Sequence, residues 1–366
     1  MSRGTRTVKT KLIKNLSSRP KELKTIGAID LHFHGAFGVD LMSASPTQLN
    51  DLSAELWKSG LAGFCPTTLT APPEDLSAAV KSLGRWIRSN RFPGAKPLGI
   101  HLEGPWIHPE KSGAHPTRFV RTMKKAELEK LWKESQETLK IITIAPERFT
   151  VPELRWITQW SQQRGVLLSA GHSQATLAEA KKGFELGVQG VTHAWNALAY
   201  HHREPGVLGA AIGNPEVYLE LIVDQVHLSL PWIRWTRQLH PPQSICLISD
   251  CTAPAGKLIS ESSPWSTLGS LKVRVKNGAS RSKTGQLAGG GLLLTQSYCR
   301  WVEAEAQDSG LPIQKILETS VNQLTRVPAR VLGIDPRSLL DRRVMWTIKH
   351  GKALSVIPID SCRSAS

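Results

Sequence analysis

The sequence has few of the features that would indicate a membrane-spanning or exported protein. Charged residues make up 21% and aromatic residues 6% of its 366 positions. Its longest uncharged stretches, such as residues 187–199, fall well short of the roughly 20 apolar residues that a membrane helix needs. The basic N-terminus is not followed by the apolar run of a secretory signal. We therefore expect a cytoplasmic protein with no membrane span.

Cysteine is scarce and scattered. The five cysteines are Cys65, Cys246, Cys251, Cys299 and Cys362. An odd number of distant cysteines with no C-x2-C pair favours neither a disulfide framework nor a zinc ribbon. We expect reduced side chains that pack against their neighbours.

Acidic residues are outnumbered, 30 against 46 Lys and Arg, which gives a formal net charge of +16. The excess is concentrated at the two ends. Residues 1–25 contain eight Lys or Arg and one acidic residue, and residues 321–366 contain eight and three. Basic ends can favour nucleic acid, but no zinc finger or RNA-binding module accompanies them. We expect solvated ends and no nucleic-acid partner.

What the sequence does contain is a regular alternation of short apolar runs and helical segments, which is typical of βα units around a parallel sheet. Helix starts are readable between the runs, because Ser45 with Gln48, and Thr176 with Glu179, form capping-box patterns. Eight strands are predicted, at 27–32, 63–69, 98–103, 141–145, 166–170, 190–193, 219–224 and 245–250. Eight parallel strands in about 225 residues fit one closed barrel better than two open sheets. The predicted fold is therefore an α/β protein with a (β/α)8 barrel.

Residues of the types that bind metal ions stand at the ends of several predicted strands, where a barrel of this kind carries its chemistry. His32 and His34 are two residues apart, so on a strand both side chains point to one face. Neutral imidazoles together with a carboxylate suit zinc or a similar divalent ion. We therefore predict a metal site formed by His32, His34, Glu103, His172 and His193.

Asp250 ends the eighth predicted strand. A carboxylate in that place can take a proton from water and later return it to a leaving amine. A metal ion beside it lowers the pKa of water and polarises a carbonyl, so hydrolysis of an amide or an ester is the natural reaction class. Asp250 is thus the predicted acid/base residue, and no organic cofactor is needed.

Nine motifs make the chain similar to N-acetylglucosamine-6-phosphate deacetylases, which belong to the metal-dependent amidohydrolase superfamily and have a (β/α)8 barrel. The resemblance spans about residues 29–291, and HREPG and TAPAG are more specific than metal-site patterns shared across the superfamily. The motifs are HLEGPW (101–106), SGAH (112–115), APE (145–147), SAGHS (169–173), THAWNAL (192–198), HREPGVLGA (202–210), VDQVH (223–227), SDCTAPAG (249–256) and LAGG (287–290).

The resemblance implies a ligand set for the metal. Glu103, His172 and His193 would hold the principal ion, with Asp250 beside it as a further metal ligand and as the acid/base residue. The H-x-H pair at 32–34 would support a second ion, so one or two ions are expected. Zinc is the expected ion, and iron and manganese are alternatives.

The resemblance also implies the reaction, hydrolysis of N-acetylglucosamine 6-phosphate to glucosamine 6-phosphate and acetate in amino-sugar or cell-wall recycling. His115 would orient or polarise the acetamide carbonyl. Arg203 would meet the phosphate, because a phosphate favours a guanidinium fork together with neutral donors. The other substrate-binding positions would be Ala114, Asn196, the Ala197 backbone N–H, Asp224, His227, Leu287, Ala288 and Gly289. Because the site in this family is completed near a subunit boundary, a homodimer is expected.

Family members usually carry a small β-domain built from both ends of the chain, and here it looks reduced. We expect a basic segment over residues 1–25, with one possible strand at 8–13, and the barrel over 26–335. Residues 336–366 would hold the remnant of that domain, with two possible strands in 344–359. The run LAGGGLLL (287–294), which we expect to be a loop, replaces a loop that commonly carries Ser in the family.

Two other functions fit the same residues. The first is deacetylation of another N-acetyl hexosamine 6-phosphate, such as the galactosamine epimer, because contacts to one hydroxyl decide between the two sugars. The second is a non-catalytic barrel that binds anions through its basic ends. The full set of predicted metal ligands, together with Asp250, favours the enzyme.

Overall fold

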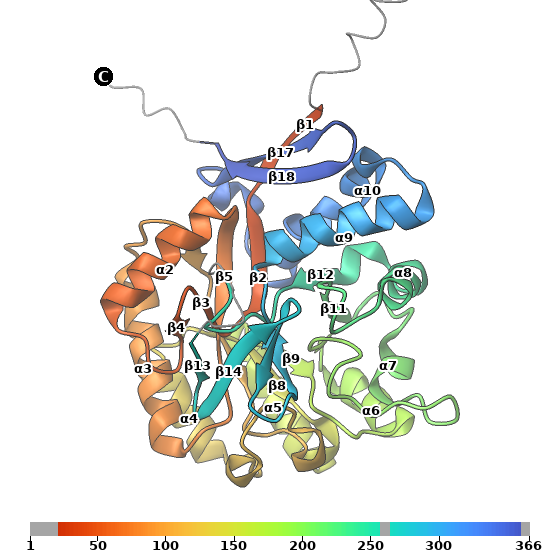
Figure 1. The fold of residues 1–366 in the computed structure, drawn as a ribbon. Coiled ribbons are helices and arrows are strands. Elements are labelled where there is room, and N and C mark those ends of the chain that lie inside the picture. The colour runs from red at the N-terminus through yellow and green to blue at the C-terminus, as the bar shows by residue number, and fades with distance from the viewer. Residues whose placement is uncertain (1–20, 257–263, 360–366) are drawn as a thin grey trace, which may run out of the picture.

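The computed structural model describes residues 21–256 and 264–359, and a parallel barrel forms its centre (Figure 1). The barrel strands are β2 (Ala28–Phe33), β5 (Leu61–Thr68), β7 (Ile100–Glu103), β8 (Leu139–Ile144), β9 (Leu167–Ala170), β10 (Gly190–Val191), β11 (Tyr218–Ile222) and β12 (Ile245–Ile248), and β6 (Lys96–Pro97) pairs with β5. Hydrogen bonds join them in the order β12-β11-β10-β9-β8-β7-β5-β2. The ring closes where Phe33 bridges Cys251 and the Asp250 N–H donates to the His32 carbonyl at 3.0 Å. The predicted fold class is confirmed.

Helices surround this barrel, and their starts follow the capping signals in the sequence. The side chains of Ser45 and Thr176 form the two predicted capping boxes. The α-helices are α2 (Pro46–Lys58), α3 (Pro73–Ser89), α4 (Lys125–Glu134), α5 (Val151–Arg164), α6 (Leu177–Leu186), α7 (Gly206–Ala211), α8 (Leu230–Leu239), α9 (Leu294–Ser309), α10 (Ile313–Ser320) and α11 (Arg326–Val331). Short 3-10 helices lie at Pro109–Lys111, Thr117–Phe119, Pro146–Arg148, Pro242–Ser244, Val321–Gln323 and Pro336–Leu339.

The two ends of the described chain meet in a small antiparallel sheet over α9 and α10 (Figure 1). It consists of β1 (Lys21–Ile26), β17 (Arg343–Lys349) and β18 (Ala353–Pro358), in the order β1-β17-β18. This confirms the expected small β-domain built from the chain termini, including the two strands expected in 344–359. The strand expected at 8–13 lies outside the described residues.

A second antiparallel sheet was not predicted. It follows the last barrel strand and consists of β13 (Ser266–Leu268), β14 (Leu271–Lys276), β15 (Ala279–Ser282) and β16 (Leu287–Gly290). A two-stranded ribbon, β3 (Gly35–Ala36) with β4 (Val39–Asp40), follows β2. Residues 287–289, interpreted as a loop, are therefore a strand, because β16 pairs with β15 and Gly290 also bridges Cys251 next to the barrel.

None of the helices formed by residues 21–256 and 264–359 combines the length and the apolar character needed to cross a membrane.

Candidate metal centre and pocket

A pocket of about 370 Å³ opens at the carboxyl end of the barrel. The barrel-strand ends form its floor, and residues of the second antiparallel sheet form part of its wall. Its lining residues are His34, Leu69, Glu103, Glu110, Lys111, Gly113, Ala114, His115, His172, His193, Asn196, Ala197, His227, Asp250, Leu268, Gln286, Leu287, Ala288 and Gly289. Most of the predicted substrate and metal positions thus line one cavity.

Glu103 lies at the centre of the first group of polar side chains. It is the last residue of β7, and its Oε1 lies 3.1 Å from Nε2 of His172 and 3.0 Å from Nε2 of His193. The two Nε2 atoms are 3.0 Å from each other. All three side chains are almost fully buried. Two imidazole nitrogens and a carboxylate that converge in this way match the donors that a divalent ion such as zinc prefers.

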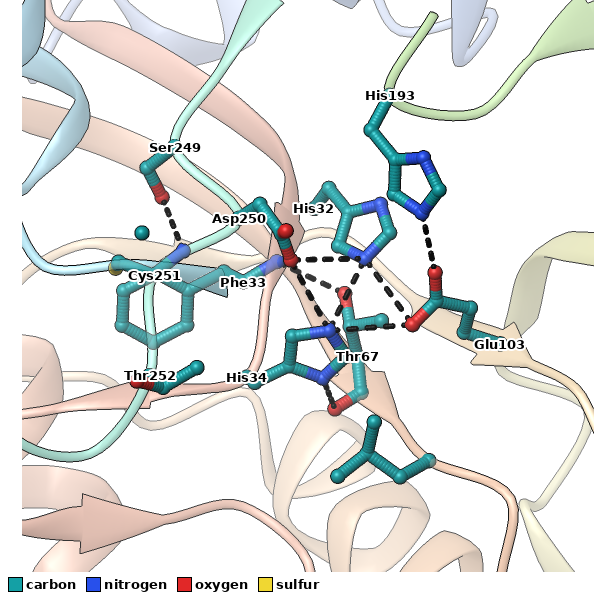
Figure 2. A network of polar contacts seen from close by, with 12 residues as sticks. His32, Phe33, His34, Thr67, Glu103, His193, Ser249, Asp250, Cys251 and Thr252 are labelled. Atoms are coloured by element: carbon teal, nitrogen blue, oxygen red, sulfur yellow. Dashed lines mark hydrogen bonds and ion pairs between the residues drawn. The ribbon is translucent and has the colours of Figure 1, made fainter. Parts of the chain in front are cut away.

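A second group faces the other oxygen of the same carboxylate. Nε2 of His32 and Nε2 of His34 are 3.1 Å apart, and Glu103 Oε2 lies 3.4 and 3.2 Å from them. Asp250 Oδ1 lies 3.4 and 3.3 Å from the same two nitrogens. Figure 2 shows both rings turned toward Glu103 and Asp250. Since Glu103 contacts both groups, the predicted ligands form one continuous cluster.

The cluster stabilises positive charge. Burial alone would lower the pKa of His34, but contact with the Asp250 and Glu103 carboxylates raises it to about 9. Burial alone would raise the pKa of Glu103, but the charge of His32 and the contacts with His115 hold it well below its usual value. Carboxylates that favour a protonated imidazole favour a bound cation for the same reason. The described residues therefore contain buried His/Glu clusters that can hold a metal ion.

Several of these residues have an unusual backbone conformation. His172, His193 and Asp250 have positive φ values of 49°, 30° and 50°, and Ala197 has a φ of 51°. Residues other than glycine rarely adopt this conformation, and such residues concentrate at functional sites because the surrounding structure has to hold them there. The backbone after β9, β10 and β12 is thus bent to turn these residues toward the pocket.

His115 comes from the loop after the 3-10 helix at Pro109–Lys111 and is held by two neighbours. The Thr70 backbone N–H donates to His115 Nδ1 at 3.1 Å, so the proton of the neutral ring lies on Nε2. Nε2 is 3.1 Å from Glu103 Oε2. Burial lowers the pKa of His115 to about 4 in spite of that carboxylate. The ring is therefore neutral, and its Nε2–H faces Glu103 at the wall of the pocket.

The predicted phosphate-binding residues are only partly brought together. Asn196, Ala197 and His227 line the pocket, and Asp224 lies behind His227, with its Oδ2 2.7 Å from Nδ1. Arg203 is exposed and does not line the pocket of its own chain. Its loop connects β10 with α7, and the HREPG motif does not by itself place the guanidinium in this cavity.

Sequence reasoning missed several residues of the wall. Lys111, next to the recognised SGAH motif, places a cation there, and its Nζ donates to the Leu198 carbonyl at 3.3 Å. Gln286, from the turn between β15 and β16, donates to the Gly113 carbonyl at 3.0 Å and ties the second sheet to the 109–115 loop. Lys111 could have been found from the sequence, because it directly precedes the SGAH motif. Gln286 could not, because the sheet that carries it was not predicted.

The fold and the cluster define a (β/α)8 barrel with a buried histidine–carboxylate centre at its carboxyl end. Comparison with known proteins agrees, since the model of the amidohydrolase family matches residues 23–337. This chain belongs to the amidohydrolase family.

Relatives with named activities extend along most of the chain. An N-acetylgalactosamine-6-phosphate deacetylase of Escherichia coli O157:H7 is 33% identical over 95% of this chain and 86% of its own length. An N-acetylglucosamine-6-phosphate deacetylase of Vibrio furnissii is 28% identical over 92% of this chain and 78% of its own length. The resemblance drawn from the motifs is confirmed.

Solved structures give the same result. An N-acetylglucosamine-6-phosphate deacetylase from Thermotoga maritima is 30% identical, covers 92% of this chain and 87% of its own, and has a TM-score of 0.74. A mutant of the Mycobacterium smegmatis enzyme in complex with N-acetyl-D-glucosamine-6-phosphate is 29% identical, covers 91% of this chain and 84% of its own, and has a TM-score of 0.79.

Proposed function

We propose that the protein hydrolyses the acetamide of N-acetylglucosamine 6-phosphate, releasing glucosamine 6-phosphate and acetate in amino-sugar or cell-wall recycling. The observation that carries the proposal is the convergence of Glu103, His172 and His193 beside Asp250 in a pocket of about 370 Å³. The names of the relatives support the substrate class. The galactosamine epimer is the second candidate, because one relative with that activity is 33% identical to this chain.

We assign Glu103, His172 and His193 to a principal divalent ion, with zinc expected and iron or manganese as alternatives. His32 and His34 would hold a second ion, and Asp250 lies next to both of these histidines. Such an ion supplies Lewis acidity and lowers the pKa of water. The close approach of the imidazole nitrogens supports this assignment, because two neutral imidazoles that face each other through their lone pairs repel unless a proton or a cation lies between them.

Asp250 is the proposed acid/base residue. Its carboxylate would accept a proton from the attacking water and pass it to the nitrogen of the leaving glucosamine. Burial alone would raise the pKa of Asp250, but the charge of His32 and the hydrogen bond from His34 hold it well below its usual value, so the carboxylate is ionised. His115 would donate its Nε2–H to the acetamide carbonyl oxygen, where negative charge develops during attack.

The sugar and its phosphate would occupy the remaining wall. Ala114, Leu287, Ala288 and Gly289 line the pocket where the ring would lie. Asn196, the Ala197 backbone N–H and His227 would bind the phosphate, and Lys111 adds a cation to the same wall. This set combines neutral and charged donors, as phosphate recognition requires.

We also propose that the protein is a homodimer and that Arg203 acts near the subunit boundary. Arg203 is exposed, and an exposed aromatic cluster lies in the neighbouring segments. The Trp195 ring contacts Tyr200 and Trp232, at centroid distances of 5.4 and 4.4 Å. Burial of such a cluster would stabilise a dimer.

A cytoplasmic location is supported by the free cysteines among the described residues.

The test measures the release of acetate from three sugars. The protein is first freed of metal with a chelator and is then assayed with and without added zinc, manganese or iron. The sugars are N-acetylglucosamine 6-phosphate, N-acetylgalactosamine 6-phosphate and unphosphorylated N-acetylglucosamine. We expect metal to restore turnover of the glucosamine 6-phosphate derivative, with about 10²–10⁴-fold loss in Asp250→Asn. Faster turnover of the galactosamine epimer would select the second candidate, and binding of metal without any turnover would reject both substrates.

A further inference from the structure

Glu220 is a buried carboxylate that none of the roles above uses. It lies within β11, in the apolar run YLELI, and is fully buried inside the barrel. Its Oε2 lies 3.2 Å from Nδ1 of His32 and 3.4 Å from the backbone N of His193. Its Oε1 is buried and has no hydrogen-bond partner among the described residues. A buried carboxylate is costly unless it is paired, so this position calls for a reason.

The two ring nitrogens of His32 point toward different groups. Nε2 faces the pocket cluster, where it lies 3.1 Å from Nε2 of His34. Nδ1 faces the barrel interior and Glu220. Because an ionised carboxylate can only accept a hydrogen bond, the contact with Glu220 places a proton on Nδ1. The lone pair of the neutral imidazole is then on Nε2, on the side of the pocket.

Glu220, His32 and His101 also lie close enough together to suggest a separate metal site deeper in the barrel. The partners of His101 argue against that interpretation. Its Nδ1 donates to the Leu31 carbonyl at 2.9 Å, and its Nε2 lies 2.8 Å from the Thr143 hydroxyl. Both nitrogens are already used, so His101 has no free lone pair to offer, and Glu220 is left with His32 as its side-chain partner.

We propose that Glu220 is the positioning residue for His32: it holds the ring in the Nδ1–H tautomer and directs Nε2 toward a divalent cation shared with His34. Histidines that bind metal commonly donate their other ring N–H to a carboxylate, which fixes the tautomer and the orientation of the ring. The contact of the same carboxylate with the His193 N–H joins the ends of β2 and β10 through one buried group. The inference rests on the proposed function in taking His32 as a metal ligand.

The test measures metal binding rather than turnover. Apoprotein of the full chain is titrated with zinc against a chelating dye, to give the number of ions bound and each Kd. Glu220→Leu removes the acceptor and is expected to lose one ion or to raise its Kd about 10- to 100-fold. Glu220→Gln keeps an acceptor oxygen for the Nδ1–H and should stay within a few-fold of the wild type. Glu305→Gln, at a buried glutamate of α9 that pairs with Arg234, is the matched control and should leave both ions unchanged.

Glu220→Asp provides a second test of the proposal if Glu220→Leu does not fold. Glu220→Asp retains the charge but withdraws the carboxylate by one methylene from His32, so the Kd should rise above that of Glu220→Gln. Wild-type stoichiometry and Kd in Glu220→Leu, or in Glu220→Asp where the leucine variant is unfolded, would overturn the proposal. If neither sugar phosphate is hydrolysed while the variants still differ in Kd, the proposed function fails and the role of Glu220 stands.

Discussion

The imidazole Nδ1 of His227 lies 2.7 Å from Oδ2 of Asp224, and both side chains are almost completely buried beside the pocket. Asp224 also accepts the backbone N–H groups of Val226 and His227. Burial alone would lower the pKa of His227, but Asp224 raises it above its usual value. In the same pair, burial would raise the pKa of Asp224, but the hydrogen bond from His227 lowers it. The pair thus keeps a cation at a wall where phosphate is proposed to bind.

This pair predicts a pH dependence of substrate binding. His227 should stay protonated up to its raised pKa, so KM for the 6-phosphate sugar should rise as the pH increases through that value. In Asp224→Asn the pKa of His227 falls, and the rise in KM should begin at lower pH. The other charged groups that act on His227 are Asp250, which raises its pKa, and Arg281, which lowers it, and both remain in the variant.

The measurement is a KM profile of both proteins with the same substrate, since the second ionisation of the phosphate, with a pKa near 6, is then common to the two. Profiles that coincide would contradict the prediction.

The effect of the His227–Asp224 pair on the free energy of unfolding has a defined pH dependence. The contribution of His227 is complete below its unfolded pKa and is lost as the pH rises through the raised value, and that of Asp224 is lost as the pH falls through its lowered value.

Lys111 yields a prediction about phosphate selectivity. Its backbone carbonyl accepts the Nδ1–H of His172 at 2.7 Å, which fixes the loop next to the histidine–carboxylate cluster. Removal of the ammonium in Lys111→Met should raise KM for the 6-phosphate sugar about 10-fold or more, because a hydrogen bond to a charged group contributes about 1.5–3 kcal/mol. The value of kcat should change little, since no proton transfer is assigned to this residue.

The comparison that decides this prediction uses the unphosphorylated sugar. Its kcat/KM should be the same in Lys111→Met and the wild type, and Lys81→Met, at an exposed position of α3, should leave both substrates unaffected. An equal loss of kcat/KM for both sugars would show that the loop is disturbed as a whole and that Lys111 does not select the phosphate.

The strand ends were predictable because two simple regularities place them. Parallel strands in a barrel bring their carboxyl ends to one rim, and the alternation of side chains along a strand puts His32 and His34 on one face. Glu103, His172 and His193 follow short apolar runs that are easy to recognise. The cluster therefore follows from local pattern and topology.

Other features depend on contacts between distant segments. Glu220 and His32 are 188 residues apart, and Glu220 lies inside an apolar run where a carboxylate has no local explanation. The second antiparallel sheet has short strands with many polar residues, and its edge is fixed by pairing with Cys251 next to the barrel. Arg203 stands in a specific motif, yet it is exposed and does not line the pocket of its own chain.

The exposed aromatic cluster predicts how the proposed dimer would be disrupted. Trp235 is 49% exposed and its ring contacts that of Trp232, which is 38% exposed. A charge introduced by Trp235→Glu would have to be desolvated in a dimer interface, so the variant should sediment as a monomer at concentrations where the wild type is dimeric. Leu311→Glu, at another exposed apolar position, is the control. A dimer that persists in Trp235→Glu would place the interface elsewhere.

Trp346 predicts that the small sheet formed by the chain ends is part of the folded core. This residue of β17 is fully buried, donates its Nε1–H to the Thr25 hydroxyl at 2.9 Å, and packs edge-on against Tyr298 of α9 at 5.3 Å. Trp346→Ala should lower the free energy of unfolding by about 3–5 kcal/mol because of the cavity it leaves. Trp346→Phe retains most of the packing and loses the hydrogen bond, so a loss of about 1 kcal/mol is expected from that bond.

Urea denaturation followed by circular dichroism measures the stability of both variants. A single transition that shifts with the variant would show that the sheet and barrel unfold together. A stability of Trp346→Ala within about 1 kcal/mol of the wild type would instead mean that the sheet contributes little to the core.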